Sequence, residues 1–129
     1  MNFLFGLAAA AAALFATPSA WAQDADAGQR VFNQCRACHT VEQAGRNGVG
    51  PNLHGMFGRT AGTVEGFRYS NPMRERGAAG LVWTEENVRA YITSPREVVP
   101  AGTMAYVGLR NEQQLNDLIA YLRRATGAP

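Results

Sequence analysis

Two cysteines and a histidine fall within five consecutive residues, Cys35-Arg36-Ala37-Cys38-His39. Side chains three residues apart lie on one face of a helical turn, so Cys35 and Cys38 can reach the two vinyl edges of one haem. His39 follows directly, and a neutral imidazole is a good ligand for iron. This C-x-x-C-H pattern is the signature of c-type haem attachment. It predicts one haem c, bound covalently through both cysteines and ligated by His39.

Three other uses of the cysteine pair fit the sequence less well. A thiol–disulfide redox pair normally follows a strand in a βαβ unit, and no strand pattern precedes Cys35. A zinc site needs four N or S ligands, and only His54 remains beyond His39. A small structural disulfide would not explain the adjacent histidine. Haem attachment is therefore the favoured interpretation.

The N-terminal segment has the pattern of a secretory signal peptide. An apolar run from Phe3 to Ala16 precedes Ala20-Trp21-Ala22, a small-x-small cleavage site. The run is shorter than the ~20 residues that span a bilayer. We therefore expect a signal peptide at 1–22 and a periplasmic domain at 23–129, with no stable membrane insertion after cleavage. The n-region lacks Lys and Arg, which leaves an uncleaved anchor as an alternative.

Composition narrows the possible partners. All 12 cationic side chains are Arg, the formal net charge is +2, and no run of like charges occurs, so nucleic-acid binding is not expected. The two cysteines offer no disulfide framework for a small exported domain. A large apolar haem would supply the missing stabilisation.

The pattern of apolar residues predicts one all-α domain with three or four short helices and long loops. A short helix should lead from Asp24 into the cysteine motif, a second should start at Thr84 and end before Pro95, and a third should start at Asn111. The last has a one-sided apolar face. Residues 40–66 and 96–109 are glycine- or proline-rich and lack periodicity, as expected of loops that wrap a ligand.

A haem held by His39 leaves one axial iron position for a second ligand. Four candidates remain after removal of Met1: His54, Met56, Met73 and Met104. A methionine is more often core filler than a ligand. Met104 lies in a constrained, non-periodic segment 65 residues after His39, so it is favoured, with His54 next.

The mature chain resembles the class I cytochromes c, and most closely the exported bacterial relatives of mitochondrial cytochrome c. The resemblance covers essentially all of residues 23–129. It is carried by motifs that occur in the family's order and spacing: Gly28-x-x-Val31-Phe32, Gly50-Pro51-Asn52-Leu53, Phe57-Gly58-Arg59, Gly66-Phe67-x-Tyr69-Ser70, Trp83, Tyr91 four residues before Pro95, Pro100 four before Met104, and Leu118 to Leu122.

The resemblance implies the cytochrome c fold, in which helices and loops wrap one haem, and it assigns roles to residues. Met104 would be the distal ligand, and the Pro51 carbonyl would accept the His39 Nδ1–H. Three residues would donate hydrogen bonds around a buried haem propionate: Arg59, Tyr69 and Trp83. Tyr91 would lie beside the Met104 sulfur, and Gly28 would let the first and last helices cross in contact with Tyr121.

The chain departs from the family pattern at three places. Gly102 stands where a Thr often precedes the methionine by two residues. The stretch from Asn71 to Gly80 is longer than in the mitochondrial form, and Met73 falls near the place of an Asn that holds a buried water. Scattered Arg residues replace the family's ring of docking lysines.

With both axial positions filled by protein, the remaining chemistry is one-electron transfer. The sequence thus predicts a monomeric periplasmic shuttle, not an enzyme, that docks transiently at its haem edge with larger respiratory or photosynthetic redox complexes. One alternative is a peroxidase-like haem enzyme or ligand sensor with a labile Met104. Another is a fixed haem subunit of a dehydrogenase or oxidase.

Overall fold

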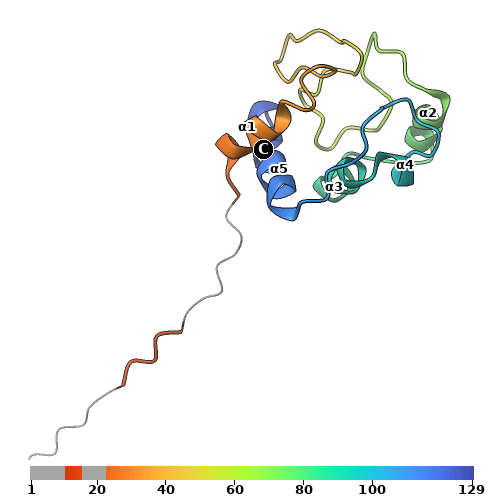
Figure 1. Ribbon diagram of the computed structural model, residues 1–129. Coiled ribbons are helices and arrows are strands. Elements are labelled where there is room, and N and C mark those ends of the chain that lie inside the picture. The colour runs from red at the N-terminus through yellow and green to blue at the C-terminus, as the bar shows by residue number, and fades with distance from the viewer. Residues whose placement is uncertain (1–10, 16–22) are drawn as a thin grey trace, which may run out of the picture.

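The computed structural model describes residues 11–15 and 23–129, so most of the expected signal peptide, including its cleavage site after Ala22, lies outside the described residues. The described chain contains five helices around a set of long loops: α1 (Ala25–Phe32), α2 (Asn71–Ala78), α3 (Glu85–Thr93), α4 (Pro95–Val98) and α5 (Glu112–Ala125) (Figure 1). Strand-like pairing in this part of the chain is a single isolated antiparallel bridge between Thr60 and Val82. The predicted all-α class is confirmed.

Helix α1 begins where the acidic residues predicted it. The Asp24 carboxylate accepts the backbone N–H groups of Asp26 and Ala27 at 2.9 and 3.0 Å, which satisfies two of the donors left free at a helix N-terminus. The backbone N–H of Asp24 is itself held by the buried Asp117 carboxylate at 3.0 Å. The start of α1 is therefore tied to α5.

Helices α1 and α5 cross at Gly28, as predicted. A Cβ added at Gly28 would overlap the Asp117 carbonyl oxygen and lie 2.8 Å from Tyr121 Cβ. The two backbones can approach this closely because glycine has no side chain. One turn later, the Phe32 and Tyr121 rings meet with centroids 5.3 Å apart.

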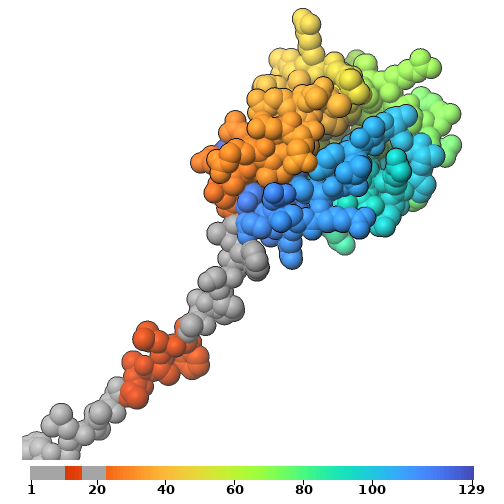
Figure 2. All heavy atoms as spheres, in the orientation of Figure 1, coloured from red at the N-terminus to blue at the C-terminus, as the bar shows by residue number. Residues whose placement is uncertain are grey.

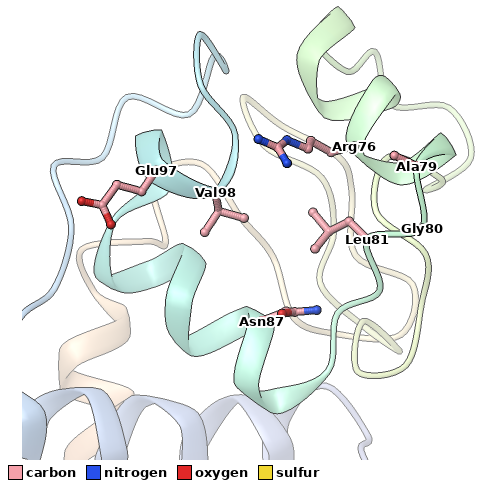
Figure 3. A pocket seen from close by; sticks show the side chains of 7 residues that line it. All are labelled: Arg76, Ala79, Gly80, Leu81, Asn87, Glu97 and Val98. Atoms are coloured by element: carbon pink, nitrogen blue, oxygen red, sulfur yellow. The ribbon is translucent and has the colours of Figure 1, made fainter.

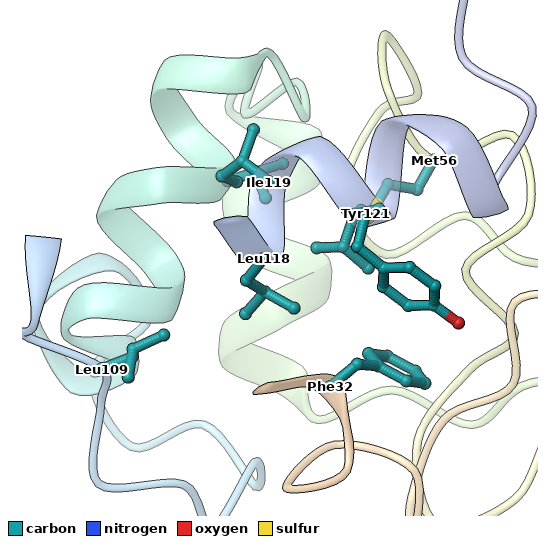
Figure 4. Packing of buried hydrophobic residues seen from close by; sticks show 8 residues of the cluster. Phe32, Met56, Leu109, Leu118, Ile119 and Tyr121 are labelled. Atoms are coloured by element: carbon teal, nitrogen blue, oxygen red, sulfur yellow. The ribbon is translucent and has the colours of Figure 1, made fainter. Parts of the chain in front are cut away.

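The hydrophobic core gathers around this crossing (Figure 4). It joins the end of α1 to α5 and takes in side chains from α3 and from the loops. Its buried members are Phe32, Met56, Val88, Leu109, Leu118, Ile119, Tyr121 and Leu122. The apolar face predicted for α5 is therefore the face that packs, with Leu115 and Ala125 partly buried at its margin.

The predicted boundaries of α3 and α5 are confirmed by their caps. The Thr84 hydroxyl accepts the Asn87 N–H at 3.1 Å, and the Asn111 side chain accepts the Gln114 N–H at 2.9 Å. Helix α3 ends at Thr93, and Pro95 then opens the one-turn helix α4, where its missing N–H is harmless.

Helices α2 and α4 were not predicted, so the described chain has five helices rather than the three or four expected, and α4 occupies the start of the stretch 96–109 that was expected to be a loop. The sequence of α2, NPMRERGA, has no apolar stripe to reveal it. The helix is instead capped by Ser70, whose hydroxyl accepts the Met73 N–H at 3.3 Å. Near its C-terminal end, Gly77 packs against the backbone of Ala61. A Cβ at Gly77 would overlap the Ala61 carbonyl oxygen, so this tertiary approach rather than periodicity positions α2.

Candidate haem site

The cysteine motif lies in consecutive tight turns that continue α1. Backbone N–H groups of Arg36 and His39 donate to Phe32 and Cys35 carbonyls at 3.1 and 3.0 Å, and the Cys38 N–H also reaches Cys35 O at 3.1 Å. Because these hydrogen bonds have helical spacing, the Cys35 and Cys38 side chains lie on one turn, as their spacing in the sequence predicted. The two cysteines form no disulfide with each other, and both are half-buried. Burial, followed by the neighbouring Cys38, raises the pKa of the Cys35 thiol to about 11.

His39 is oriented by a backbone carbonyl. Its Nδ1 lies 2.8 Å from Pro51 O. Since a carbonyl oxygen only accepts, Nδ1 must carry the proton, and Nε2 keeps its lone pair for a metal. Burial lowers the pKa of His39, against the opposing effect of the Pro51 hydrogen bond, so the ring favours the neutral form that binds iron. The contact implied by the family resemblance is present.

Gly50 completes the support of the histidine ring, a role not predicted from the sequence, where it is only part of the Gly50-Pro51-Asn52-Leu53 motif. A Cβ at Gly50 would lie 2.7 Å from His39 Nδ1 and 2.8 Å from Nε2, closer than carbon atoms tolerate. The Gly50 N–H also donates to Cys38 O at 2.8 Å, which holds this backbone against the cysteine turn. The Gly50-Pro51 pair shortly after the C-x-x-C-H motif is the sequence signal that could have identified the role of Gly50.

Met104 lies half-buried on the loop between α4 and α5. The loop is anchored on its N-terminal side by buried Val99: a Cβ at Gly102 would lie 3.1 Å from both Val99 Cγ1 and Val99 O. This crowding gives the departure at Gly102 a physical reason. On the C-terminal side, the Leu109 N–H donates to Ile92 O at 2.9 Å. Both ends of the Met104 loop are thus held.

The other three candidate ligands have different surroundings. Met56 is a core residue with 6% of its surface exposed, and Met73 belongs to the first turn of α2. The His54 ring packs beside the end of α5, where a Cβ at Gly127 would lie 3.0 Å from its Cε1. The neighbouring Gly55 N–H donates to Thr126 O at 2.9 Å, which fixes His54 to this end of the helix.

The structure brings Arg59, Tyr69 and Trp83 into one region. The Arg59 guanidinium donates to His54 O at 2.9 Å, and its backbone carbonyl accepts the Trp83 N–H at 2.9 Å. The Tyr69 hydroxyl accepts the Val64 N–H at 2.9 Å, which leaves its own proton free to donate.

Burial dominates the titration of these residues. It lowers the pKa of Arg59 and raises that of Tyr69, and the attraction between the two partly offsets both shifts. Tyr91 lies against Trp83, with ring centroids 5.0 Å apart, and burial raises the pKa of Tyr91 to about 12. At neutral pH, Tyr69 and Tyr91 are therefore neutral hydroxyls that can donate hydrogen bonds.

A separate cavity of about 370 Å³ opens between α2, α3 and α4 (Figure 3). Its walls include the side chains of Arg76, Asn87 and Glu97, which are polar and come from three different helices. None of the cysteine, histidine or methionine residues of the candidate haem site lines it. The cavity is therefore distinct from that site.

The residues present fit a c-type haem. Two cysteines that form no disulfide lie on one turn, a histidine is oriented with Nε2 available, and the backbone at Gly50 leaves room for the imidazole. Among the described residues, no group of three or more His, Cys, Asp and Glu side chains could hold a metal ion by itself. The donor set thus suits a haem iron with its own four nitrogen ligands rather than a bare ion.

Comparison with known proteins agrees with this chemistry. The cytochrome c family model matches residues 25–126. The chain is 44% identical over 123 residues to cytochrome c2 of Blastochloris viridis, covering 95% of this chain and 92% of the relative. It is 41% identical to cytochrome c2 of Afifella marina (75% and 78% covered) and 43% identical to cytochrome c-550 of Ancylobacter novellus (74% and 90% covered).

The chain belongs to the cytochrome c family. Its cofactor is haem c, bound covalently through Cys35 and Cys38, and its role is that of an electron carrier. Within the part of the chain that the structure describes, no helix has both the length and the apolar character needed to cross a membrane.

Proposed function

We propose that this cytochrome is a periplasmic one-electron carrier whose haem iron is ligated by His39 and Met104. When bound in this way, the haem supplies reversible transfer of one electron at iron, without an open position for a substrate. The observation that carries the proposal is the 2.8 Å contact from His39 Nδ1 to Pro51 O, because it places the proton on Nδ1 and leaves the basic Nε2 able to bind a metal.

Met104 is the partner of His39 in this proposal. Its loop is held at Val99 and at Leu109, so the thioether can be presented at a constant position in both redox states. A soft thioether favours Fe(II) over Fe(III), which raises the reduction potential relative to a second histidine. An anchored loop also argues against the alternative of an enzyme or sensor with a labile methionine.

The surrounding side chains would shield the buried edge of the cofactor. Arg59 and Tyr69 can offer a cation and a hydroxyl proton to a carboxylate, and Trp83 can add its indole N–H. Tyr91, stacked on Trp83, would lie beside the Met104 sulfur. These groups would compensate the negative charge of a haem propionate, which is costly to bury alone.

The proposed location follows from the N-terminal segment and the domain it precedes. Cleavage after Ala22 would leave residues 23–129 in an oxidising compartment where c-type haem is attached. There the carrier would dock transiently, as a monomer, with larger redox complexes at its haem edge.

Replacement of the two competing ligands tests the proposal. Met104→Ala should abolish the weak far-red methionine–iron band, give high-spin or misligated iron and lower the reduction potential. A fall of about 0.06 V would correspond to a tenfold loss of electron affinity. The matched variant His54→Ala should leave the spectrum and potential nearly unchanged. Loss of the low-spin spectrum in His54→Ala, with none in Met104→Ala, would contradict the ligand assignment.

A further inference from the structure

A long-range hydrogen bond joins the segment that bears Cys35 to the segment that bears Met104. The Tyr106 hydroxyl donates to Gln34 Oε1 at 3.0 Å, between residues 72 positions apart. Gln34 immediately precedes Cys35, and Tyr106 follows Met104 by two residues. Figure 2 shows the orange surface that contains the cysteine motif meeting the blue surface of the segment after α4.

Both partners of this hydrogen bond are anchored behind it. The Tyr106 ring is partly buried and packs against the hydrophobic core. Gln34 lies in the turns that continue α1, and its N–H donates to Val31 O at 3.2 Å. The hydroxyl and the amide therefore meet at the surface while the groups that carry them are fixed to the protein interior.

The rest of the Met104 loop has few other ties. Among the described residues, none from 103 to 108 donates or accepts a backbone–backbone hydrogen bond. The nearest such bonds are Gly102 N–H to Val99 O at 3.1 Å and Leu109 N–H to Ile92 O at 2.9 Å, at the two ends of the loop. Tyr106 is thus the residue whose side chain hydrogen-bonds the middle of the loop to the attachment segment, while Gly108 near the end of the loop packs closely against Thr93 O.

We propose that the Tyr106–Gln34 hydrogen bond is a clasp that holds the Met104 loop against the haem-attachment segment. Tyr106 and Gln34 would be positioning residues for the methionine ligand, so the inference rests on the proposed His39/Met104 ligation. In this proposal, release of Met104 from a haem iron would proceed through an outward movement of its loop, and that movement would break the Tyr106–Gln34 hydrogen bond. The effect should be greatest in the ferric protein, where a soft thioether binds less strongly.

The test measures how fast imidazole replaces Met104 in the ferric holoprotein, followed by loss of the far-red methionine–iron band. Tyr106→Phe keeps the ring and removes the hydroxyl, and Gln34→Leu keeps the bulk and removes the acceptor. Each should accelerate replacement by about two- to tenfold, the range expected for loss of one net hydrogen bond. The double variant should be no faster than either single variant, because both remove the same interaction.

Two further variants separate positioning from general stability. Gln34→Glu retains an acceptor for the hydroxyl and should keep replacement near the wild-type rate. Asp26→Asn removes the negative charge from the exposed 2.9 Å pair with Arg124, which links α1 to α5 away from the loop, and should leave the replacement rate unchanged. An equal acceleration by Asp26→Asn would mean that the rate follows overall stability rather than the clasp.

The outcomes also distinguish the two proposals. If the wild-type holoprotein shows the methionine–iron band but the Tyr106 and Gln34 variants react at its rate, the clasp is refuted and the ligation stands. Additive acceleration in the double variant would refute the clasp as well. If wild-type protein lacks the band, the proposed ligation fails, and the clasp fails with it because there is no ligand to position.

Discussion

The α1–α5 crossing and the loops that carry the proposed haem ligands are ordered by different forces. At the crossing, apolar side chains are almost completely buried: Leu118 and Ile119 have 1% and 0% of their surface exposed. On the loops, the proposed ligands His39 and Met104 are only half-buried. The His39 ring is positioned by its contact with Pro51 O and by the room that Gly50 leaves for it, and the Met104 loop packs at Gly102 against Val99.

This difference shows how a small chain divides folding from function. Apolar packing between two helices is tolerant of loop sequence and needs little besides a matching pair of faces. The loops bury much less apolar surface, so their order depends on fixed backbone contacts and on the covalent haem. The two regions should therefore respond differently when the haem, a glycine or a surface charge is changed.

Removal of the haem should have the largest effect, and it should fall mainly on the loops. A Cys35→Ala/Cys38→Ala variant without haem should lack a cooperative thermal transition, because the folded state no longer gains the binding free energy of the cofactor. Residual amide protection should concentrate in α1 and α5. A cooperative transition near the temperature of the holoprotein would contradict this division.

Gly28→Ala should have the largest effect confined to the helix crossing. Alanine normally stabilises a helix by about 1 kcal/mol relative to glycine. Here the added Cβ would overlap the Asp117 carbonyl oxygen, so the helices must separate, and unfolding free energy should fall by about 2 kcal/mol or more. Chemical denaturation of the holoprotein measures this loss of unfolding free energy.

The control for the crossing is Gln29→Ala, an exposed position in the same helix. It should change the unfolding free energy by less than about 0.5 kcal/mol. If Gly28→Ala is instead as stable as the wild type, the close approach of α1 and α5 is not needed.

Gly50→Ala should disturb the candidate haem site at the His39 ring. The new Cβ must push the His39 ring away from its place beside the Pro51 carbonyl, at a cost of about 1–3 kcal/mol. We expect a shifted reduction potential and a less stable holoprotein. Gly48→Ala is a matched control two residues away, where the added Cβ would make an ordinary 3.4 Å contact with Cys38 O. Equal behaviour of the two variants would show that Gly50 does not shape the site.

Reversal of surface charge should have the smallest effect. Arg36, in the attachment motif, and Arg96, at the start of α4, are exposed and can steer an acidic partner toward the haem edge. Arg36→Glu and Arg96→Glu should slow the second-order reaction with such a partner only modestly, since the formal net charge is +2. The slowing should shrink as salt is raised, because exposed charges are screened within ~8–10 Å.

Arg123→Glu, near the C-terminal end of α5, is the control for a change in net charge. Arg123 also forms a 3.6 Å pair with Glu85, so its stability must be measured in parallel. Equal slowing by all three reversals, or a rate that does not depend on salt, would show that docking uses another face or apolar contact.

Local patterns in the sequence were enough to predict the parts of the molecule that rest on short-range rules. The C-x-x-C-H spacing indicated haem attachment. The capping residues Thr84 and Asn111 predicted where α3 and α5 start. The apolar face of α5 identified three residues of the buried core, Leu118, Ile119 and Leu122. Each of these signals lies within one or two helical turns, where spacing alone decides which side chains share a face.

Only the tertiary structure decided the features that depend on the meeting of distant segments. Helix α2 has no apolar period and is positioned by the approach of Gly77 to Ala61, while the role of Gly50 depends on how its backbone faces the His39 ring. The contact of Tyr106 with Gln34 spans 72 positions and carries no sequence pattern of its own. Such contacts arise from the path of the folded backbone, which places residues together regardless of their spacing along the chain.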